Sequence, residues 1–134
     1  GFALYIRPIL QEAGLGHLEV VTNELVFEGP APSQLHPNGH PVCIGCGTCK
    51  MLAAQQRRER DGQVAFVGDG QSDRYGALYS DIVFAKDALV AICELDGVPF
   101  RRWETFDDVR EGLEIIETLA GPVGGERCPG WRSP

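Results

Sequence analysis

The 134-residue chain lacks any apolar run long enough to cross a membrane, and it lacks the charged, then apolar start of a secretory signal peptide. Basic residues are also scarce, because 12 Lys and Arg stand against 19 Asp and Glu and leave a net charge of −7. This acidic balance argues against a nucleic-acid-binding surface. The sequence therefore predicts a protein with neither a membrane nor a nucleic acid as its partner.

The five cysteines do not suit a secreted disulfide framework, because their number is odd and three of them are crowded together as Cys43, Cys46 and Cys49. With His40 nearby, this segment offers four ligands of the kind that tetrahedral zinc requires. Iron–sulfur ligation would need a fourth nearby cysteine. The alternative is a group of small reduced thiols in a glycine-rich turn. Both interpretations favour a reducing compartment, and we expect a cytoplasmic protein.

Between residues 50 and 120, short apolar runs alternate with helical patterns. The runs at 64–67 and 82–85 are apolar throughout, as is typical of strands buried on both faces. This alternation predicts an α/β fold, a partial Rossmann-like arrangement with a mainly parallel sheet and helices on both faces. The further elements expected here are a strand at 100–103 and helices at 50–60, from 73, at 88–95 and from 105 to 120.

The first 49 residues show weaker patterns. The elements expected there are a helix at 5–13, with Pro8 in its first turn, and strands at 18–21 and 25–27. Residues 28–48 form a long irregular segment that contains His36 and His40, and a segment of this kind usually has a function or an organising ligand. Residues 121–134, rich in glycine and proline, are expected to form a flexible tail.

The segment Gly68-Asp69-Gly70-Gln71-Ser72-Asp73 follows a buried strand and opens a helix, and ligands of open α/β sheets bind at the carboxyl ends of strands. Asp69 would project from the strand end and Asp73 would lie in the first helical turn, so that both carboxylates could converge on one Mg²⁺ ion. The two glycines would let the backbone turn sharply, and Gly70 would leave room for a phosphate. The alternative is a plain turn in which Ser72 or Asp73 caps the helix.

Lys50 opens the helix that precedes this strand. An ammonium group at a helix N-terminus opposes the helix dipole at a small energetic cost. This misfit favours a functional lysine over the alternative, a solvated side chain with no role.

Several further segments follow one another in a telling order. They are Gly1-Phe2, Tyr5-Ile6-x-Pro8-Ile9-Leu10, Gly14-Leu15, Gly68-Asp69-Gly70-x-Ser72-Asp73, Asp81-Ile82-Val83-Phe84-Ala85-Lys86, Leu89, Cys93, Gly97-Val98-Pro99-Phe100 and Thr105-Phe106-Asp107-Asp108-Val109. This series resembles the C-terminal part of the core of a haloacid dehalogenase superfamily phosphatase, of the phosphoserine-phosphatase-like branch. By this resemblance, residues 1–120 form the C-terminal part of such a haloacid-dehalogenase-like core domain.

The resemblance implies Mg²⁺-dependent hydrolysis of a small phosphorylated substrate, a phosphate monoester. It implies that Asp69 binds Mg²⁺, directly or through water, and that Asp73 supports the metal or orients Lys50. Lys50 matches the family's third-motif lysine, which stabilises the phosphoryl charge as a compact cation. Ser72 matches a position that often touches phosphate, and Gly1 would be the last phosphate-facing residue of the second motif.

The family's Asp-x-Asp motif does not occur in the printed sequence. Its first Asp attacks phosphorus and its second acts as general acid and base. We therefore expect a fragment that is inactive without a missing N-terminal segment or a companion chain, or else a short protein that has lost catalysis. A rival hypothesis is a non-catalytic metal-binding or interaction module organised by His40, Cys43, Cys46 and Cys49.

Overall fold

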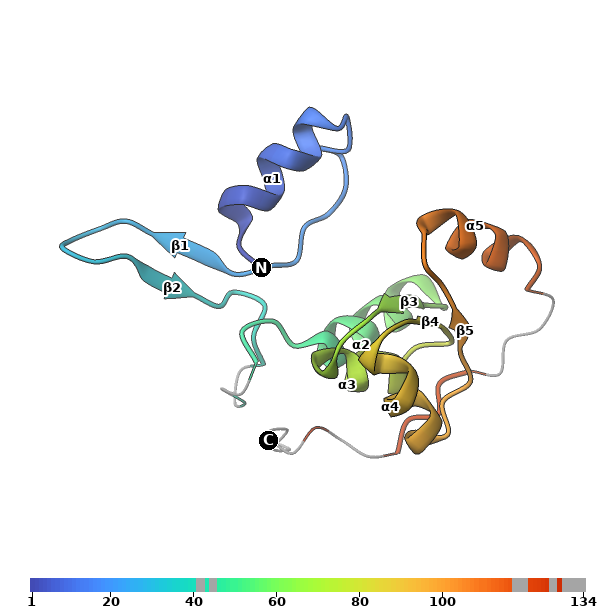
Figure 1. Ribbon diagram of the computed structural model, residues 1–134. Helices are drawn as coiled ribbons and strands as arrows, with labels where there is room; N and C mark the ends of the chain where they lie inside the picture. Colours follow the sequence, from blue (N-terminus) through green and yellow to red (C-terminus); the bar gives the residue numbers. More distant parts are fainter. Residues whose placement is uncertain (41–42, 44–45, 117–120, 126–127, 129–134) are drawn as a thin grey trace. The chain divides into compact units, whose positions relative to one another are not determined.

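The computed structural model describes residues 1–40, 43, 46–116, 121–125 and 128. It divides into two compact units, which we call the N-terminal unit (Gly1–Cys49) and the sheet unit (Lys50–Cys128) (Figure 1). Each unit has its own elements and its own pattern of burial.

The sheet unit is built on three parallel strands, β3 (Ala65–Gly68), β4 (Ile82–Ala85) and β5 (Arg101–Arg102), paired in that order. Its helices are α2 (Lys50–Asp61), the 3₁₀ helix η1 (Gln71–Asp73), α3 (Arg74–Leu78), α4 (Ala88–Asp96) and α5 (Phe106–Glu114). Helices connect strands that run in the same direction, as the alternation of patterns predicted. The predicted α/β class with a parallel sheet is confirmed, and the arrangement is consistent with a partial Rossmann-like fold.

The register of the sheet brings the carboxyl ends of its strands to one edge. Gly68, the last residue of β3, and Arg102, the last residue of β5, are opposite the same residue of β4. The residues that follow the three strands, Asp69, Lys86 and Trp103, therefore emerge at the same edge. This is the edge at which open α/β sheets bind ligands.

The core of the sheet unit is a cluster of nearly inaccessible apolar residues from α3, β4, α4 and the turn before β5. Its members are Ala77, Leu78, Val83, Ala85, Leu89, Val90, Cys93 and Val98. Helix α3 packs directly on β3, because a Cβ atom at Gly76 would lie 2.3 Å from the Phe66 ring. Burial, with the nearby Asp96 carboxylate, raises the pKa of the Cys93 thiol to about 11. Cys93 is thus a packing residue.

Helices of the sheet unit begin and end at local signals. Gly62 and Gly97 follow α2 and α4 with φ angles of 82° and 67°, a left-handed conformation that glycine adopts without a Cβ clash. Thr105 precedes α5, and the Asp108 carboxylate accepts hydrogen bonds from the N–H groups of Thr105 and Glu104 at 2.8 and 2.9 Å. These bonds hold the pKa of Asp108 below its ordinary value.

The prediction that the last helix continues to residue 120 is wrong, because α5 ends at Glu114. Two β-branched residues, Ile115 and Ile116, follow the helix. Ile115 is 63% exposed, so its packing does not stabilise a further helical turn. Residues 117–120, at the end of the predicted helix, lie outside the described residues. In the tail, the N–H of Gly124 donates to the carbonyl of Leu78 at 2.8 Å; the flexibility of the tail stays a prediction.

Within its described residues, the N-terminal unit has the helix α1 (Ala3–Glu12), whose position agrees with the predicted helix at 5–13. The helix starts two residues earlier than predicted, so that Pro8 lies in its second turn and not in its first. Gly14 follows the helix with a φ angle of 73°, as a terminating glycine should. No helix in the described part of the chain is long and apolar enough to cross a membrane.

A short antiparallel hairpin completes the described part of the N-terminal unit. It pairs β1 (Glu24–Val26) with β2 (Ser33–Leu35). The strand expected near 25–27 is thus confirmed, whereas the one expected at 18–21 is absent from the structure, where Leu18 is 48% exposed. The segment expected to be irregular contains β2, whose Ser-Gln-Leu sequence is exposed throughout and so shows no hydrophobic alternation.

Candidate active site

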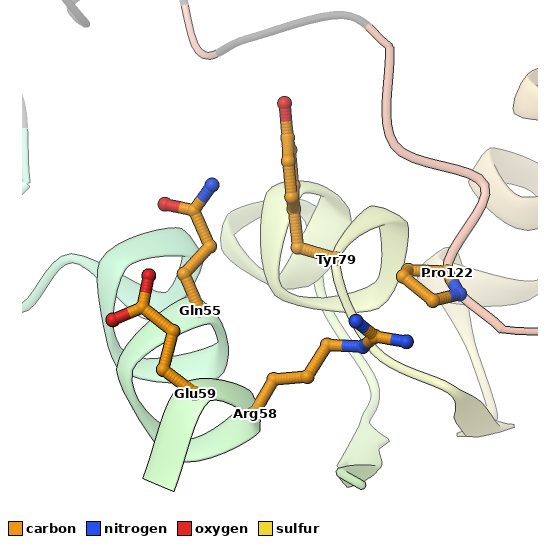
Figure 2. A pocket seen from close by; sticks show the side chains of 5 residues that line it. All are labelled: Gln55, Arg58, Glu59, Tyr79 and Pro122. Atoms are coloured by element: carbon orange, nitrogen blue, oxygen red, sulfur yellow. The ribbon is translucent and has the colours of Figure 1, made fainter. Parts of the chain in front are cut away.

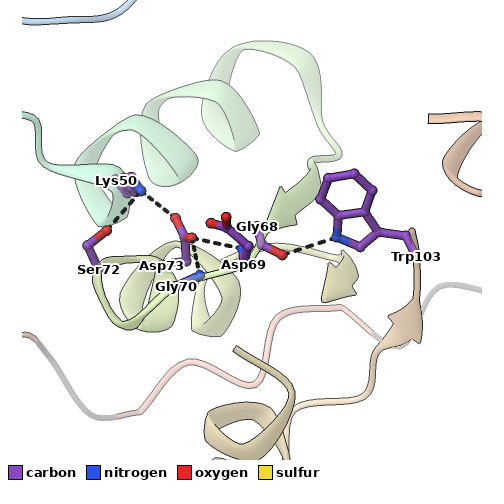
Figure 3. Close-up of polar contacts among 7 residues, drawn as sticks. All are labelled: Lys50, Gly68, Asp69, Gly70, Ser72, Asp73 and Trp103. Carbon is purple, nitrogen blue, oxygen red and sulfur yellow. Dashed lines mark hydrogen bonds and ion pairs between the residues drawn. The ribbon is translucent and has the colours of Figure 1, made fainter. Parts of the chain in front are cut away.

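The predicted site of the sheet unit lies where β3 ends and η1 begins. Asp69 follows β3 directly, and Ser72 and Asp73 belong to η1. Lys50, the first residue of α2, reaches this turn from a distant part of the sequence. Figure 3 shows the four side chains gathered at the end of the strand. The structure therefore brings Lys50 to the segment from Gly68 to Asp73 that the sequence predicted as a site.

Asp73 is the centre of this arrangement and is only 4% exposed. One of its carboxylate oxygens, Oδ2, accepts hydrogen bonds from the N–H groups of Asp69 and Gly70, at 3.0 and 2.9 Å. The other, Oδ1, forms an ion pair with the Lys50 ammonium. Burial raises the pKa of Asp73, but the bonds from Lys50 and the two N–H groups outweigh it, so the pKa lies below its ordinary value. Asp73 is therefore a charged anchor for the turn.

Lys50 is held by two side chains of η1. Its Nζ donates to Asp73 Oδ1 and, at 3.1 Å, to the hydroxyl of Ser72. The Lys50 side chain keeps 38% of its surface exposed, so its charge is fixed in direction while part of it remains accessible to a ligand. This contact explains why a lysine is tolerated at the start of α2, where the helix dipole disfavours it.

Gly68 has a different role from the one predicted, while the room that Gly70 would leave for a phosphate stays a prediction. Neither Gly68 nor Gly70 has a positive φ angle, so the turn does not require glycine for its backbone angles. A Cβ atom at Gly68 would lie 2.8 Å from the carboxyl carbon of Asp73. Gly68 is therefore needed because it leaves room for the buried carboxylate.

The donor set suits one hard cation, with Asp69 as its ligand. Asp69 is exposed, and its carboxylate accepts no hydrogen bond from any residue that the structure describes. Both oxygens of Asp73 are already engaged, which fits a role through Lys50 better than direct ligation. Mg²⁺ usually binds one or two carboxylates and keeps several waters, so a site with a single carboxylate from this unit fits the ion. The described residues contain no group of three or more His, Cys, Asp or Glu side chains that could hold a metal.

The cysteine segment does not show the predicted metal-binding arrangement. Within the described residues, His40, Cys43, Cys46 and Cys49 form no metal-binding group. Cys43 and Cys49 are buried, whereas Cys46 is exposed. The His40 ring accepts a hydrogen bond from the N–H of Cys43 at 3.1 Å. None of the chain's five cysteines, all within the described part, forms a disulfide, and the rival hypothesis of a metal-organised module gains no support.

Two other residues of the sequence prediction belong to the N-terminal unit. Gly1 belongs to the N-terminal unit, where its carbonyl accepts a hydrogen bond from the Thr22 hydroxyl at 2.6 Å. Its role towards phosphate stays a prediction. His36, also in this unit, is paired with the Asn23 side chain at 3.1 Å.

Sequence reasoning missed two residues at the same edge of the sheet, Lys86 and Trp103. The Trp103 indole N–H donates to the carbonyl of Gly68 at 3.1 Å, and the Lys86 ammonium lies 4.1 Å from the centre of the indole ring. Each follows the last residue of a strand, which is the one signal in the sequence that could have identified them.

A surface cavity of about 250 Å³ lies elsewhere on the sheet unit (Figure 2). It is lined by Gln55, Arg58, Glu59, Tyr79 and Pro122. Arg58 is held by an ion pair with Asp81 at 3.0 Å. None of the predicted site residues lines this cavity, so its size gives no reason to move the candidate site away from the strand end.

Comparison with known proteins finds similarity to phosphatases over most of the chain. It is 29% identical over 122 residues to a 2-hydroxy-3-keto-5-methylthiopentenyl-1-phosphate phosphatase from Exiguobacterium sibiricum, a match covering 90% of this chain and 55% of the relative. It is 33% identical over 118 residues to the phosphatase of the same name from Bacillus cereus, covering 87% of this chain and 53% of the relative. The chain thus spans about half the length of the curated relatives it matches. No family model matches it.

These relatives support the coarser part of the sequence prediction, a phosphatase of the haloacid dehalogenase type with a hydrolase role. The finer assignment to the phosphoserine-phosphatase-like branch remains a prediction, as does a cytoplasmic location. The dependence on Mg²⁺ and the status as a fragment belong to the proposal that follows.

Proposed function

We propose that this chain supplies the C-terminal part of the active site of a Mg²⁺-dependent phosphomonoester hydrolase of the haloacid dehalogenase type. One observation carries the proposal: an ammonium, a buried carboxylate and an accessible carboxylate converge at the carboxyl end of a parallel strand. The similarity to phosphatases over most of the chain supports the same reading.

Lys50 is the residue that would contact the phosphoryl group. Its ammonium is held in place by Asp73 and Ser72, so little reorganisation is needed when negative charge accumulates on the phosphoryl oxygens. A cation that is fixed in advance stabilises the charge of the transition state more than a mobile one does. Asp73 acts here as a positioning residue for Lys50, and the Ser72 hydroxyl lies close enough to Lys50 to contact the same phosphate.

Asp69 is the residue that would hold Mg²⁺, directly or through water. The ion, when bound, would neutralise phosphate charge and orient the phosphoryl oxygens for attack. The part of Asp69 in this is to present an exposed carboxylate at the end of β3. The residues that attack phosphorus and transfer protons are expected from an Asp-x-Asp motif, which the printed sequence does not contain.

The proposed substrate is a small phosphate monoester, which water cleaves to an alcohol and inorganic phosphate. The relatives' names specify 2-hydroxy-3-keto-5-methylthiopentenyl-1-phosphate, and this compound is the first candidate. Its identity and that of a companion chain or N-terminal segment are open to direct test.

The experiment measures Mg²⁺-dependent release of inorganic phosphate by the full-length protein that carries this chain, together with any chain that co-purifies. The substrates are the relatives' substrate, phosphoserine and other small phosphomonoesters. We expect turnover that is lost on chelation and that falls about a thousandfold on Asp69→Asn. Turnover that is indifferent to Asp69→Asn and to chelation would contradict the proposal.

The printed chain alone provides the complementary test. Without an Asp-x-Asp motif we expect it to show no turnover, and intact mass spectrometry of active material should reveal a species that carries this motif. Robust Mg²⁺-dependent phosphate release by the pure chain, lost on Asp69→Asn, would contradict the claim that the missing carboxylates are required.

A further inference from the structure

The peptide group between Gly68 and Asp69 is held from both sides. Its carbonyl oxygen accepts two hydrogen bonds, from the Trp103 indole N–H at 3.1 Å and from the N–H of Lys86 at 3.2 Å. Its N–H donates to Asp73 Oδ2 at 3.0 Å. The plane of this one peptide is thus fixed by three bonds from three different parts of the sheet unit.

The following peptide is fixed as well. The carbonyl of Asp69 accepts a hydrogen bond from the N–H of Leu89 at 3.1 Å. Leu89 is fully buried, so this donor is anchored in the core. Between Lys86 and Leu89 lies Asp87, whose φ of 48° is the sole positive value of a non-glycine residue in the described part of the chain. Strained backbone of this kind persists where surrounding contacts determine it, and it concentrates at functional sites.

The Trp103 ring also contacts an aromatic ring and an ammonium group. The centre of its indole ring lies 5.4 Å from that of Phe106, with the rings tilted by 42°, and the Lys86 ammonium lies 4.1 Å from the centre of the indole ring. Figure 3 shows Lys50 and Ser72 on one side of Asp69 and Trp103 on the other. Asp69 therefore stands between the proposed phosphate-binding cation and an aromatic side chain whose only N–H group points back at the strand end.

We propose that Trp103 is a positioning residue for the Asp69 carboxylate, acting through the Gly68–Asp69 peptide. Rotation of this peptide would turn the Cα–Cβ bond of Asp69 and move its carboxylate, and metal sites lose affinity when ligands are displaced by fractions of an ångström. The role of Trp103 in metal binding rests on the proposed function of Asp69. The hydrogen bond from Trp103 to this peptide does not depend on that function, so the two effects can be measured separately.

The first measurement is amide hydrogen exchange of the metal-free full-length protein, with Trp103→Phe compared to the parent. Loss of the indole donor should raise the exchange rate of the Asp69 amide about tenfold. The amides of Val83 and Phe84, in the centre of β4, should keep their rates. An unchanged rate at Asp69, or an equal rise at all three amides, would overturn the proposal, because Trp103 would then contribute only to general packing.

An isosteric replacement guards against loss of packing in Trp103→Phe. Benzothienylalanine at position 103 keeps the two-ring shape and replaces only the N–H by sulfur, and it should reproduce the faster exchange at Asp69. Phe106→Leu is the matched control, since it removes the neighbouring ring and keeps the indole N–H, and it should leave the Asp69 rate unchanged. Normal exchange at Asp69 in the benzothienylalanine protein would refute the role of the hydrogen bond.

The second measurement is calorimetric titration of the same proteins with Mg²⁺. Affinity should fall about tenfold when the indole N–H is removed and should be unchanged in Phe106→Leu. Equal affinity in all variants would overturn the link between Trp103 and the metal. If the parent protein itself binds no Mg²⁺, the proposed function of Asp69 fails, while the exchange rates still decide whether Trp103 positions the peptide.

Discussion

The two units of the chain differ in how their residues are buried. The sheet unit has a continuous apolar core, in which Phe84, Ala85 and Leu89 are 0% exposed. In the N-terminal unit α1 has no buried residue, and Leu4 and Ile9 are 57% and 62% exposed. Both units contain cysteine, histidine or carboxylate residues that suggested chemistry. In the sheet unit the side chains of Lys50, Ser72 and Asp73 bond to one another, whereas in the N-terminal unit the His40 ring accepts a bond from the backbone N–H of Cys43.

This difference shows what a functional arrangement of polar side chains requires. Asp73 can keep a buried charge because the core fixes the N–H groups and the ammonium that compensate it. The cysteine segment follows an exposed three-residue strand, and its described residues form no metal-binding group. The comparison indicates that residues with a suggestive spacing in the sequence form a functional site only where packing fixes the backbone that carries them.

The largest expected difference between the units is in stability. Leu89→Ala should destabilise the sheet unit by about 3 kcal/mol, because it leaves a cavity next to the strand end. Leu4→Ala, on the exposed face of α1, should change the stability of the N-terminal unit by less than about 0.5 kcal/mol. Hydrogen exchange of amides in each unit, with and without urea, measures both. Equal effects would mean that α1 is covered in solution and that the comparison is wrong.

The second expected difference is in catalysis by the full-length protein. Lys50→Met should lower kcat about a hundredfold, because the phosphoryl charge loses its fixed cation. Lys50→Arg should restore little, since a planar guanidinium cannot occupy the position of a compact ammonium between Asp73 and Ser72. Arg7→Met, which removes an exposed cation of the N-terminal unit, is the control and should leave kcat unchanged. A similar loss of kcat in Lys50→Met and Arg7→Met would mean that the overall charge of the protein, and not a site, causes the effect.

The third expected difference is in the response to acid. The pKa of Asp73 in the folded protein lies below its ordinary value of 3.8. The carboxylate therefore stabilises the sheet unit fully above about pH 5, and this stabilisation is lost as the pH falls below 3.8 and through the folded-state pKa. Asp73→Asn should cost about 1.5 kcal/mol near neutral pH and progressively less in acid. Urea unfolding between neutral pH and pH 3 tests this; a cost that does not shrink in acid would contradict it.

The sequence predicted the sheet unit well because its signals are local and agree with each other. The apolar runs around Phe66 and Phe84 both form strands, as predicted, and Gly62 and Gly97 end their helices by conformations that glycine alone adopts freely. Burial on both faces is confirmed for most of β4, whereas in β3 the prediction is wrong, because Ala65 is exposed and Phe66 and Val67 are half-buried. The contact between Lys50 and Asp73 could be expected, because Lys50 opens the helix before β3 and Asp73 lies shortly after the end of β3.

The features that sequence reasoning missed depend on tertiary contacts. The bond from Trp103 to Gly68 joins residues 35 positions apart, and nothing in the local pattern around Trp103 indicates its direction. Strand β2 is polar and exposed, so its pairing with β1 leaves no periodic signal. Gly68 was predicted to allow a sharp turn. Glycine is instead required there because a Cβ atom would clash with the side chain of Asp73, five residues later.

By the proposed function, the metal site lies in the sheet unit, at Asp69, and not in the cysteine segment. The most direct test replaces Mg²⁺ by paramagnetic Mn²⁺ and follows the broadening of amide signals in the full-length protein by NMR. We predict that the amides of Asp69 and Gly70 broaden first and that Asp69→Asn abolishes this broadening. Broadening that begins around His40 and Cys43, and that persists in Asp69→Asn, would contradict the account.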